Sequence, residues 1–281
     1  MPGTLFVVAT PIGNLEDITL RALRVLREAD VIAAEDTRRT AGLLAHHGVS
    51  TPTVSFHEHN TRTRIPQLLA RLARGERVAL VTDAGTPGVS DPGTELVAAC
   101  IEQGIAIDPI PGASAPLVAA VASGFSLEPL TILGFAPYRS KDRNKWLVEV
   151  SRILHTFTFF ETPHRIEATL AEASRLLANR PIVVGRELTK IHQEFLRGFT
   201  DVTVFGQMTL AKGEFTVVVG PARVEEPKSA ASDNEVVALF WQMTELGGSS
   251  RRQTIAAVAK QVRRSTRDVY AVVERAKLSG E

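Results

Sequence analysis

The sequence has a single cysteine, Cys100, in 281 residues, so no disulfide can form within the chain. The lack of disulfides is typical of a reducing compartment, and we expect a cytoplasmic protein. Cys100 lies in an apolar helical pattern and is interpreted as a small core residue, not as a nucleophile. No apolar run approaches the roughly 18 residues of a membrane span, and the first residues lack the pattern of a signal peptide. We therefore expect neither a membrane protein nor a secreted one.

Two ligand-binding signatures are also missing. The sequence contains no G-x-G-x-x-G motif, which argues against an ordinary dinucleotide-binding domain. His57 and His59 form a His-x-His pair, but no third ligand follows at a spacing familiar from metal sites, so we predict no metal centre. A hydrogen-bonding or proton-transferring role suits these histidines better.

The most informative stretch that is present is residues 81–93, V-T-D-A-G-T-P-G-V-S-D-P-G. It follows an apolar run at residues 78–81, which predicts a buried strand, and it precedes a helical pattern at residues 94–103. Ordinary strand-to-helix loops need about two to six residues, and this one is about twice as long. Glycine-rich loops at strand ends bind small ligands in open α/β sheets, so we predict a ligand site here.

Strand and helix patterns alternate five times in the first part of the chain. The expected strands are residues 5–8, 31–34, 53–56, 78–81 and 105–110, and the expected helices are 17–28, 43–47, 61–74, 94–103 and 117–123. This alternation is typical of a largely parallel α/β sheet. For the charged residues 35–39 after the second strand, we favour a functional role over a self-contained salt-bridge cluster. Ser114, after the fifth strand, is placed to cap the next helix.

The pattern restarts near residue 130 and becomes more antiparallel. Strands are expected at residues 131–135, 156–160, 182–184, 194–198 and 215–219, with helices at 146–154 and 166–177 and a basic loop at 136–144. The organisation that we predict is an α/β domain at residues 1–115, a second α/β domain at 116–222, a linker at 223–233 and a small basic domain at 234–281.

The last segment predicts three short helices, each with a capping pair at its start. The pairs are Ser232 with Glu235, Ser250 with Gln253, and Ser265 with Asp268, and the first helix should stop at Gly247 and Gly248. Residues 248–281 hold eight Lys or Arg and three Asp or Glu, a net charge of +5, so the remainder carries −4 of the total +1. A basic helix-turn-helix that binds nucleic acid is favoured over a helical hairpin without a ligand.

Eight motifs, in order, resemble the ribosomal RNA small-subunit methyltransferase I family. They are residues 9–18, 34–38, 59–60, 81–93, 111–113, 160–165, 186–190 and 212–215, so the resemblance runs from about residue 4 to 221. It implies a two-domain tetrapyrrole-methylase fold, S-adenosyl-L-methionine in the cleft between the domains, and a homodimer. It also implies 2′-O-methylation of a cytidine ribose in the decoding region of 16S ribosomal RNA, within the small ribosomal subunit.

The same resemblance assigns candidate roles to individual residues. The cofactor would be held by Pro11, Asp83, Ala84, Gly85, Val89, Ser90, Gly112, Ser114 and Ala115 from the first domain, and by Phe160, Gly213, Glu214, Phe215 and Thr216 from the second. Asp36, His59 or Glu187 could accept the proton of the ribose hydroxyl. Candidates for RNA contacts are Arg38, Arg165, Arg186 and Lys190, together with Arg251, Arg252, Arg263 and Arg264 of the basic domain.

Two other functions fit part of this pattern. Methylation of a tetrapyrrole precursor would use the same fold and cofactor, but a small macrocycle needs no basic helical extension. A non-catalytic RNA-binding protein with a relic pocket would not need the intact cleft motifs. Both features favour the methylation of ribosomal RNA.

Overall fold

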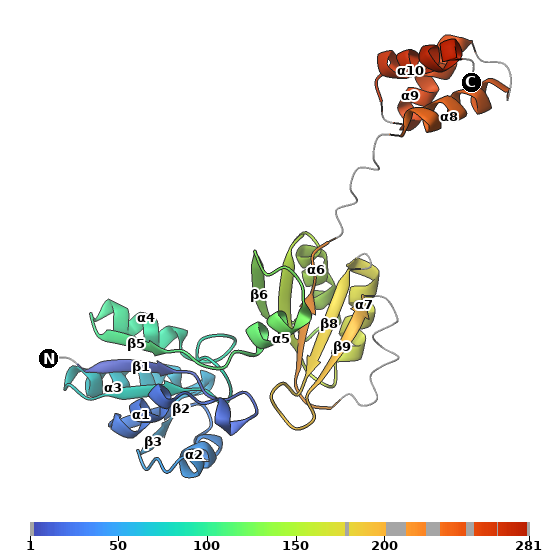
Figure 1. Ribbon diagram of the computed structural model, residues 1–281. Coiled ribbons are helices and arrows are strands. Elements are labelled where there is room, and N and C mark those ends of the chain that lie inside the picture. Colours follow the sequence, from blue (N-terminus) through green and yellow to red (C-terminus); the bar gives the residue numbers. More distant parts are fainter. Residues whose placement is uncertain are drawn as a thin grey trace. The chain divides into compact units, whose positions relative to one another are not determined.

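The computed structural model describes residues 3–177, 180–200, 212–222, 231–245, 250–262 and 264–279. The chain divides into two compact units, Met1–Ala222 and Arg223–Glu281, drawn in Figure 1 in blue to orange and in orange to red. Most of the expected linker, the glycines at which the first basic-domain helix should stop, and Arg263 lie outside the described residues. The boundary at residue 115 stays a prediction.

The first sheet contains five parallel strands in the order β3-β2-β4-β1-β5 (Figure 1). The strands are β1 (Thr4–Val8), β2 (Val31–Ala34), β3 (Thr53–Ser55), β4 (Val78–Val81) and β5 (Ala106–Ile110). The helices between them are α1 (Leu20–Glu28), α2 (Thr37–His46), α3 (Thr61–Ala73) and α4 (Thr94–Glu102), and the short 3₁₀ turns are η1 (Leu15–Asp17) and η2 (Glu58–Asn60). The expected parallel α/β arrangement is confirmed.

Helices cover both faces of this sheet, because β2 and β4 are apolar along their whole length and buried on both sides. Alternate strand residues pack on α1 and α2 through Val25, Leu26 and Leu44. The other strand residues pack on α3 and α4 through Leu72 and Cys100. Cys100 is therefore a core residue, as predicted, and burial raises the pKa of its thiol to about 11.

The crossover directions place a topological switch point between β1 and β4. The chain leaves β1 through α1 on one face of the sheet and leaves β4 through α4 on the opposite face. Adjacent strands whose connections diverge in this way open a crevice at their carboxyl ends. The loops after these two strands begin at Ala9 and Thr82, and the second of them is the glycine-rich stretch singled out in the sequence.

The second sheet is mixed, with the order β6-β7-β10-β8-β9. Its strands are β6 (Leu130–Phe135), β7 (Thr156–Glu161), β8 (Pro181–Arg186), β9 (Glu194–Phe199) and β10 (Phe215–Val219). β6 and β7 are parallel, and the other pairs are antiparallel. The carboxyl ends of β6, β7 and β8 therefore share one edge with Phe215, the first residue of β10.

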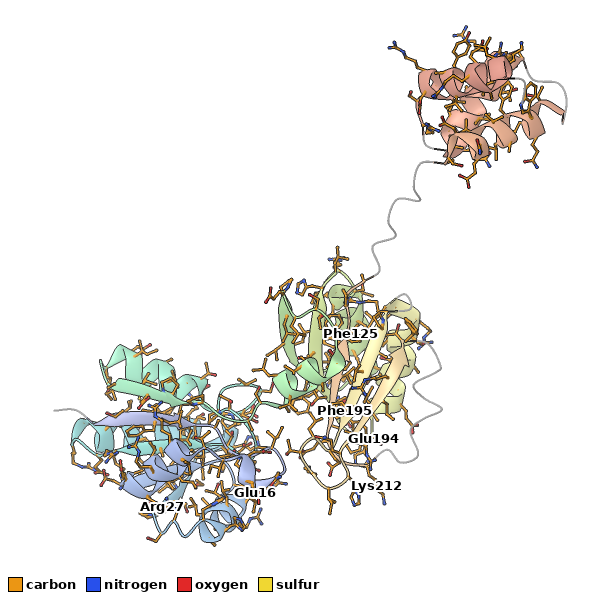
Figure 2. All side chains as sticks on the ribbon, in the orientation of Figure 1. Glu16, Arg27, Phe125, Glu194, Phe195 and Lys212 are labelled. Carbon is orange, nitrogen blue, oxygen red and sulfur yellow. The ribbon has the colours of Figure 1, made fainter. Side chains whose placement is uncertain are left out.

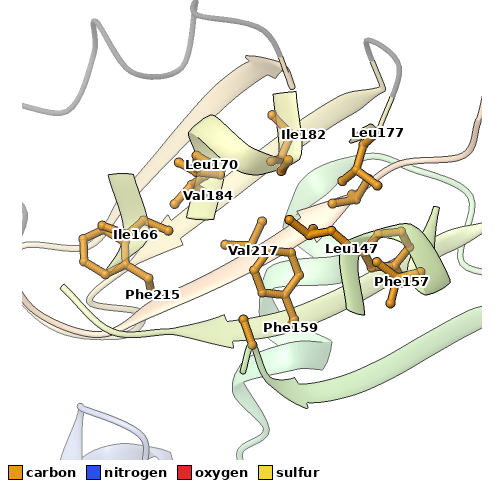
Figure 3. Close-up of a cluster of buried hydrophobic side chains, with 14 of the residues drawn as sticks. Leu147, Phe157, Phe159, Ile166, Leu170, Leu177, Ile182, Val184, Phe215 and Val217 are labelled. Atoms are coloured by element: carbon orange, nitrogen blue, oxygen red, sulfur yellow. The ribbon is translucent and has the colours of Figure 1, made fainter. Parts of the chain in front are cut away.

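Three helices cover this second sheet. α6 (Ser140–Val150) and α7 (Ile166–Leu176) pack on the face that carries Phe157, Phe159 and Val217, as Figure 3 shows. α5 (Ala115–Ser123) covers the other face, where Phe125 and Phe195, labelled in Figure 2, are partly buried. Ile12 and Leu188 belong to the same apolar cluster as α5. The N–H of Asn14 donates to the Thr189 hydroxyl at 3.0 Å, so the loop after β1 contacts the loop after β8.

Several element boundaries differ from those expected. α2 begins at Thr37 and not at residue 43, because the Asp36 side chain caps it by accepting the N–H of Arg38. α6 begins at Ser140, so the expected basic loop is largely helical. Within it, Arg143 is buried and paired with Glu172 of α7 at 2.8 Å. Ser114 is the N-cap residue of α5, but its side chain makes no capping hydrogen bond.

The second unit contains α8 (Asp233–Glu245), α9 (Arg251–Val262) and α10 (Thr266–Ser279), packed around a small apolar core. The three expected capping pairs are confirmed. Ser232 exchanges hydrogen bonds with Glu235. The backbone N–H and the hydroxyl of Ser250 both donate to the side-chain oxygen of Gln253, and the Ser265 hydroxyl accepts the N–H of Asp268. Each helix that the structure describes is too short or too polar to span a bilayer.

Candidate cofactor-binding site

A cavity of about 330 Å³ lies within the first unit, where the carboxyl ends of strands from both sheets meet. Twelve of the fourteen residues predicted to bind the cofactor line it: Asp83, Ala84, Gly85, Val89, Ser90, Ser114, Ala115, Phe160, Gly213, Glu214, Phe215 and Thr216. Pro11 and Gly112 do not line it. Pro11 is buried next to Ile12, and Ile12 does line the cavity. Gly112 lies against Ala9: a Cβ added to Gly112 would be 2.9 Å from the Cβ of Ala9.

The loops after β1 and β4 are joined at the base of the cavity. Thr10 and Gly85 form an antiparallel bridge in which each backbone N–H donates to the other residue's carbonyl, at 2.8 and 3.1 Å. The Thr10 hydroxyl also donates to the carbonyl of Thr82 at 3.0 Å. Gly85 has a φ of 83°, in the region where glycine is favoured, so the glycine is needed for this turn.

A group of carboxylates forms one wall of the cavity. Asp83 accepts the N–H of Asp36 at 3.1 Å, and its own N–H donates to Glu35 at 3.2 Å. Arg39 pairs with Asp83 at 3.3 Å. Asp91 lies on the same loop, and burial, together with the negative charges of Glu35 and Asp83, raises the pKa of Asp91 to about 7. This wall can bind a cation or accept hydrogen bonds from hydroxyl groups.

Another wall comes from the second sheet and carries three aromatic rings. Phe135, Phe160 and Phe215 line it, with the rings of the first two 5.2 Å apart. The turn after β7 is fixed by Glu161, whose buried carboxylate pairs with Arg165 at 2.7 Å and accepts the Thr169 hydroxyl at 2.6 Å. The more buried rings of this wall, Phe160 and Phe215, can hold an aromatic ring system.

None of the three candidate proton acceptors lines the cavity. Hydrogen bonds from the Arg38 side chain and backbone hold the pKa of Asp36 far below its usual range, so Asp36 is a weak base. Although burial alone raises the pKa of Glu187, hydrogen bonds from Lys190 and the N–H of Glu214 leave it below its usual value. His59 is exposed beside His57.

The sequence interpretation left Glu35, Arg39 and Asp91 without a role in the cavity. Each lies within a motif that was recognised, residues 34–38 or 81–93, or directly beside one. Spacing alone does not show which side chains of a loop turn inward, so the motif could have identified the segment but not these residues. Among the described residues, no three His, Cys, Asp or Glu side chains are grouped to hold a metal ion.

Most of the candidate RNA-binding residues have partners within the protein. Arg165 is held by Glu161, Thr162 and the carbonyl of Ala136, and Lys190 pairs with Glu187 and Glu214. Arg186 contacts Glu194 and the carbonyl of Lys212, two residues that Figure 2 labels. Arg38 pairs with Asp36, but 89% of its side chain is exposed.

In the second unit, the arginines also differ in their surroundings. Arg264 pairs with Asp233 and Asp268 and is only 17% exposed. Arg251 pairs with Glu274 and lies over the ring of Tyr270. Arg252 is exposed at the start of α9. Arg38, Arg251 and Arg252 are thus exposed, whereas the other candidates that the structure describes are partly buried, and the RNA-binding role stays a prediction for all of them.

Comparison with known proteins places this fold in a class. A family model described as Tetrapyrrole (Corrin/Porphyrin) Methylases matches residues 4–201. The structure of the cobalamin biosynthetic enzyme cobalt precorrin-4 methyltransferase is 19% identical, with a TM-score of 0.58 over 77% of this chain and 94% of that one. Uroporphyrin-III C-methyltransferase from Thermus thermophilus, solved in complex with S-adenyl homocysteine, is 18% identical, with a TM-score of 0.55 over 77% of this chain and 97% of that one.

Fold and cavity together define a methyltransferase of the tetrapyrrole methylase class. Two relatives, both called ribosomal RNA small subunit methyltransferase I, are far more similar in sequence. The protein from Halalkalibacterium halodurans is 48% identical over 80% of this chain and 79% of its own length, and that from Synechocystis sp. is 42% identical over 95% and 96%. The chain belongs to the ribosomal RNA small subunit methyltransferase I family, and its cofactor is S-adenosyl-L-methionine.

The residues of the cavity fit this cofactor. Its sulfonium and ammonium groups are cations, which the wall of Glu35, Asp83 and Asp91 can bind. Its adenine is a flat ring suited to the apolar wall at Phe160 and Phe215. The glycines of the loop after β4 allow the backbone to approach a ligand closely.

Proposed function

We propose that this chain methylates the 2′-hydroxyl of a cytidine ribose in the decoding region of 16S ribosomal RNA. The observation that carries the proposal is the match to the Synechocystis relative, which extends over 95% of this chain and so includes the basic helical unit as well as the cavity. A macrocycle methylase would need the cavity but not the second unit. The working form that we propose is a cytoplasmic homodimer acting on the small ribosomal subunit.

In this proposal the cavity holds the cofactor and turns its reactive end toward the acceptor. When bound, S-adenosyl-L-methionine supplies an activated methyl group, so the protein mainly has to align the donor with the ribose oxygen. Asp83 and Glu35 face the charged end, since their carboxylates line the wall and are fixed by the loop hydrogen bonds. Pro11, next to the lining residue Ile12, and Gly112, packed against Ala9, would hold the loops around the cofactor, and Phe160 and Phe215 would exclude water.

The 2′-hydroxyl is a poor nucleophile unless its proton is accepted by a base. Asp36, His59 and Glu187 remain candidates, although the ion pairs of the two carboxylates favour structural roles. Asp91 is added as a fourth candidate, because it lines the cavity and changes charge near neutral pH. Arg38 and Arg252 would contact RNA phosphates, which positions the substrate without reading its sequence.

The proposal is tested by incubating the protein and methyl-labelled S-adenosyl-L-methionine with small ribosomal subunits that lack the modification. Nuclease digestion and mass spectrometry then locate the label. Label on the 2′-oxygen of one cytidine in the decoding region is the expected result. Label on a base or on ribosomal protein would refute the ribose assignment, and transfer only to a uroporphyrinogen supplied in a parallel reaction would refute ribosomal RNA as the substrate.

A further inference from the structure

Phe135 is an aromatic residue at the mouth of the cavity that the protein leaves half open. Its side chain lines the cavity, yet 54% of the residue is exposed to solvent. The ring of Phe160 lies 5.2 Å away at an angle of 44° and occupies the deeper position. An exposed phenylalanine next to a binding cavity leaves an apolar surface free for a partner that arrives from outside.

The backbone is shaped to hold Phe135 in this position. The pairing of β6 with β7 runs in register to Ile132 and Thr158 and then resumes at Phe135 and Phe160, so β6 contains one extra residue. Such a bulge redirects the side chain that follows it, and bulges are frequent beside active sites. Gly134, in the bulge, has a φ of 71°, and a Cβ added to it would lie 3.1 Å from the hydroxyl of Ser90. The backbone that carries Phe135 thus lies close to Ser90, in the loop after β4.

The segment after Phe135 combines aromatic and basic side chains. Tyr138 is 82% exposed, and the Arg165 guanidinium covers its ring at 5.4 Å. Arg139 is exposed directly before α6, and Lys141 and Lys145 are exposed in the first two turns of that helix. Exposed aromatic rings interleaved with cations are typical of surfaces that bind single-stranded nucleic acid, where bases stack and phosphates pair.

We propose that Phe135 stacks on the unpaired base of the nucleotide that is methylated, and that this contact places the ribose at the cavity mouth. The inference rests on the proposed function, since it names how that substrate is held. Proteins that recognise RNA by sequence bind bases that have left the helix and stack them on aromatic side chains. Phe135 is a positioning residue in this account, because its ring takes no part in the bonds that form or break.

The inference is tested with three substitutions and a matched control. Phe135→Ala removes the ring, Phe135→Leu keeps an apolar side chain without a ring, and Phe135→Tyr keeps the ring. Ile132→Ala is the control, since Ile132 is 41% exposed on the same strand and does not line the cavity. For each variant, the KM for unmodified small subunits and kcat are measured by label transfer, and the Kd for S-adenosylhomocysteine is measured by calorimetry.

We expect Phe135→Ala and Phe135→Leu to raise the KM for the subunit by about 10-fold or more, as for the loss of one stacked base. The Kd for S-adenosylhomocysteine should stay the same, Phe135→Tyr should restore the KM, and Ile132→Ala should change neither. An unchanged KM in Phe135→Leu would overturn the inference, as would an equal loss of cofactor affinity, which would make Phe135 part of the cofactor site. Failure of the wild-type protein to label ribose is a separate result and would remove the proposed function itself.

Discussion

The Oε1 atom of Glu187 lies 2.9 Å from the backbone nitrogen of Glu214 and accepts its N–H. The N–H of Glu187 in turn donates to the carbonyl of Glu214 at 3.0 Å, and Lys190 pairs with both carboxylates. Glu187 thus fastens the turn that carries Gly213 and Glu214 into the cavity wall. This arrangement favours a structural role for a residue that the sequence pattern had offered as a possible base.

Replacing Glu187 separates these two roles. In Glu187→Gln the amide oxygen can still accept the N–H of Glu214, so we expect the affinity for S-adenosylhomocysteine to stay within about 3-fold of wild type. Glu187→Ala removes the hydrogen bond and the ion pair with Lys190 that fix the turn, and we expect binding to weaken on the order of 10-fold, about 1–2 kcal/mol. Calorimetry gives both affinities. Glu194→Ala, which removes a neighbouring carboxylate outside the cavity wall, is the control.

The kcat of the same variants shows whether Glu187 is instead the catalytic base. If Glu187 accepts the proton of the ribose hydroxyl, Glu187→Gln should bind S-adenosylhomocysteine normally and lose about 100-fold or more in kcat. That result would restore Glu187 as the base and set aside the fastening role as its main contribution.

Gly213 lies against the Glu187 carboxylate, so replacing Gly213 tests the same turn. Its φ is 96°, and a Cβ added to it would lie 2.5 Å from the Glu187 carboxylate oxygen. We therefore expect Gly213→Ala to displace the turn and to weaken S-adenosylhomocysteine binding about 10-fold or more, as measured by calorimetry. The double variant with Glu187→Ala should lose less than the sum of the two single losses, because the overlap is then gone. Additive losses would show that the two residues act independently.

Features that depend on neighbours in sequence were predictable from the sequence. The loop at residues 81–93 stands out by its length and its glycines, and the capping pair of Ser232 and Glu235 is three residues apart. The position of Cys100 in the core followed from the periodicity of its own helix.

Features that depend on distant partners were not predictable in the same way. Arg143 looked like part of a basic loop, because its partner Glu172 lies on the next helix and only the folded chain pairs them. The role of Glu187 depends on Glu214, which is 27 positions away. The environment of Asp91 likewise depends on Glu35, which comes from a different strand end.

Arg180 is a buried arginine that binds backbone carbonyls at one end of the second sheet, and its replacement measures how much these bonds stabilise the fold. The residue is 3% exposed, and its guanidinium has no carboxylate partner among the described residues. The guanidinium donates to the carbonyls of Ile153, His155 and Gly220 at 2.6 to 2.8 Å. Burial lowers the pKa of Arg180 to about 10, so it remains charged at neutral pH. Arg180→Met leaves three carbonyls unsatisfied, and we expect it to lower the free energy of unfolding by about 3 kcal/mol in urea titrations. Arg175→Met, on the exposed side of α7, should change it by less than about 0.5 kcal/mol.

The shifted pKa of Asp91 makes the free energy of unfolding decrease as pH rises toward neutrality. Its pKa is about 7 in the folded state and about 3.8 when exposed, because burial and the charges of Glu35 and Asp83 disfavour the ionised form. The folded state therefore binds the proton more tightly, and the stability that this provides is lost as pH rises from about 4 through about 7.

An asparagine at this position cannot ionise, so Asp91→Asn should be free of that loss. We expect the melting temperature of Asp91→Asn minus that of wild type to increase from pH 5 to pH 8 and to level off above about pH 8. Thermal unfolding followed by circular dichroism in a buffer series measures the difference. Asp108→Asn, which removes a carboxylate on β5 outside the cavity, should not reproduce this change with pH. A difference that is constant from pH 5 to pH 8 would mean that Asp91 is already ionised at pH 5 in the folded protein, and it would remove Asp91 from the candidate bases.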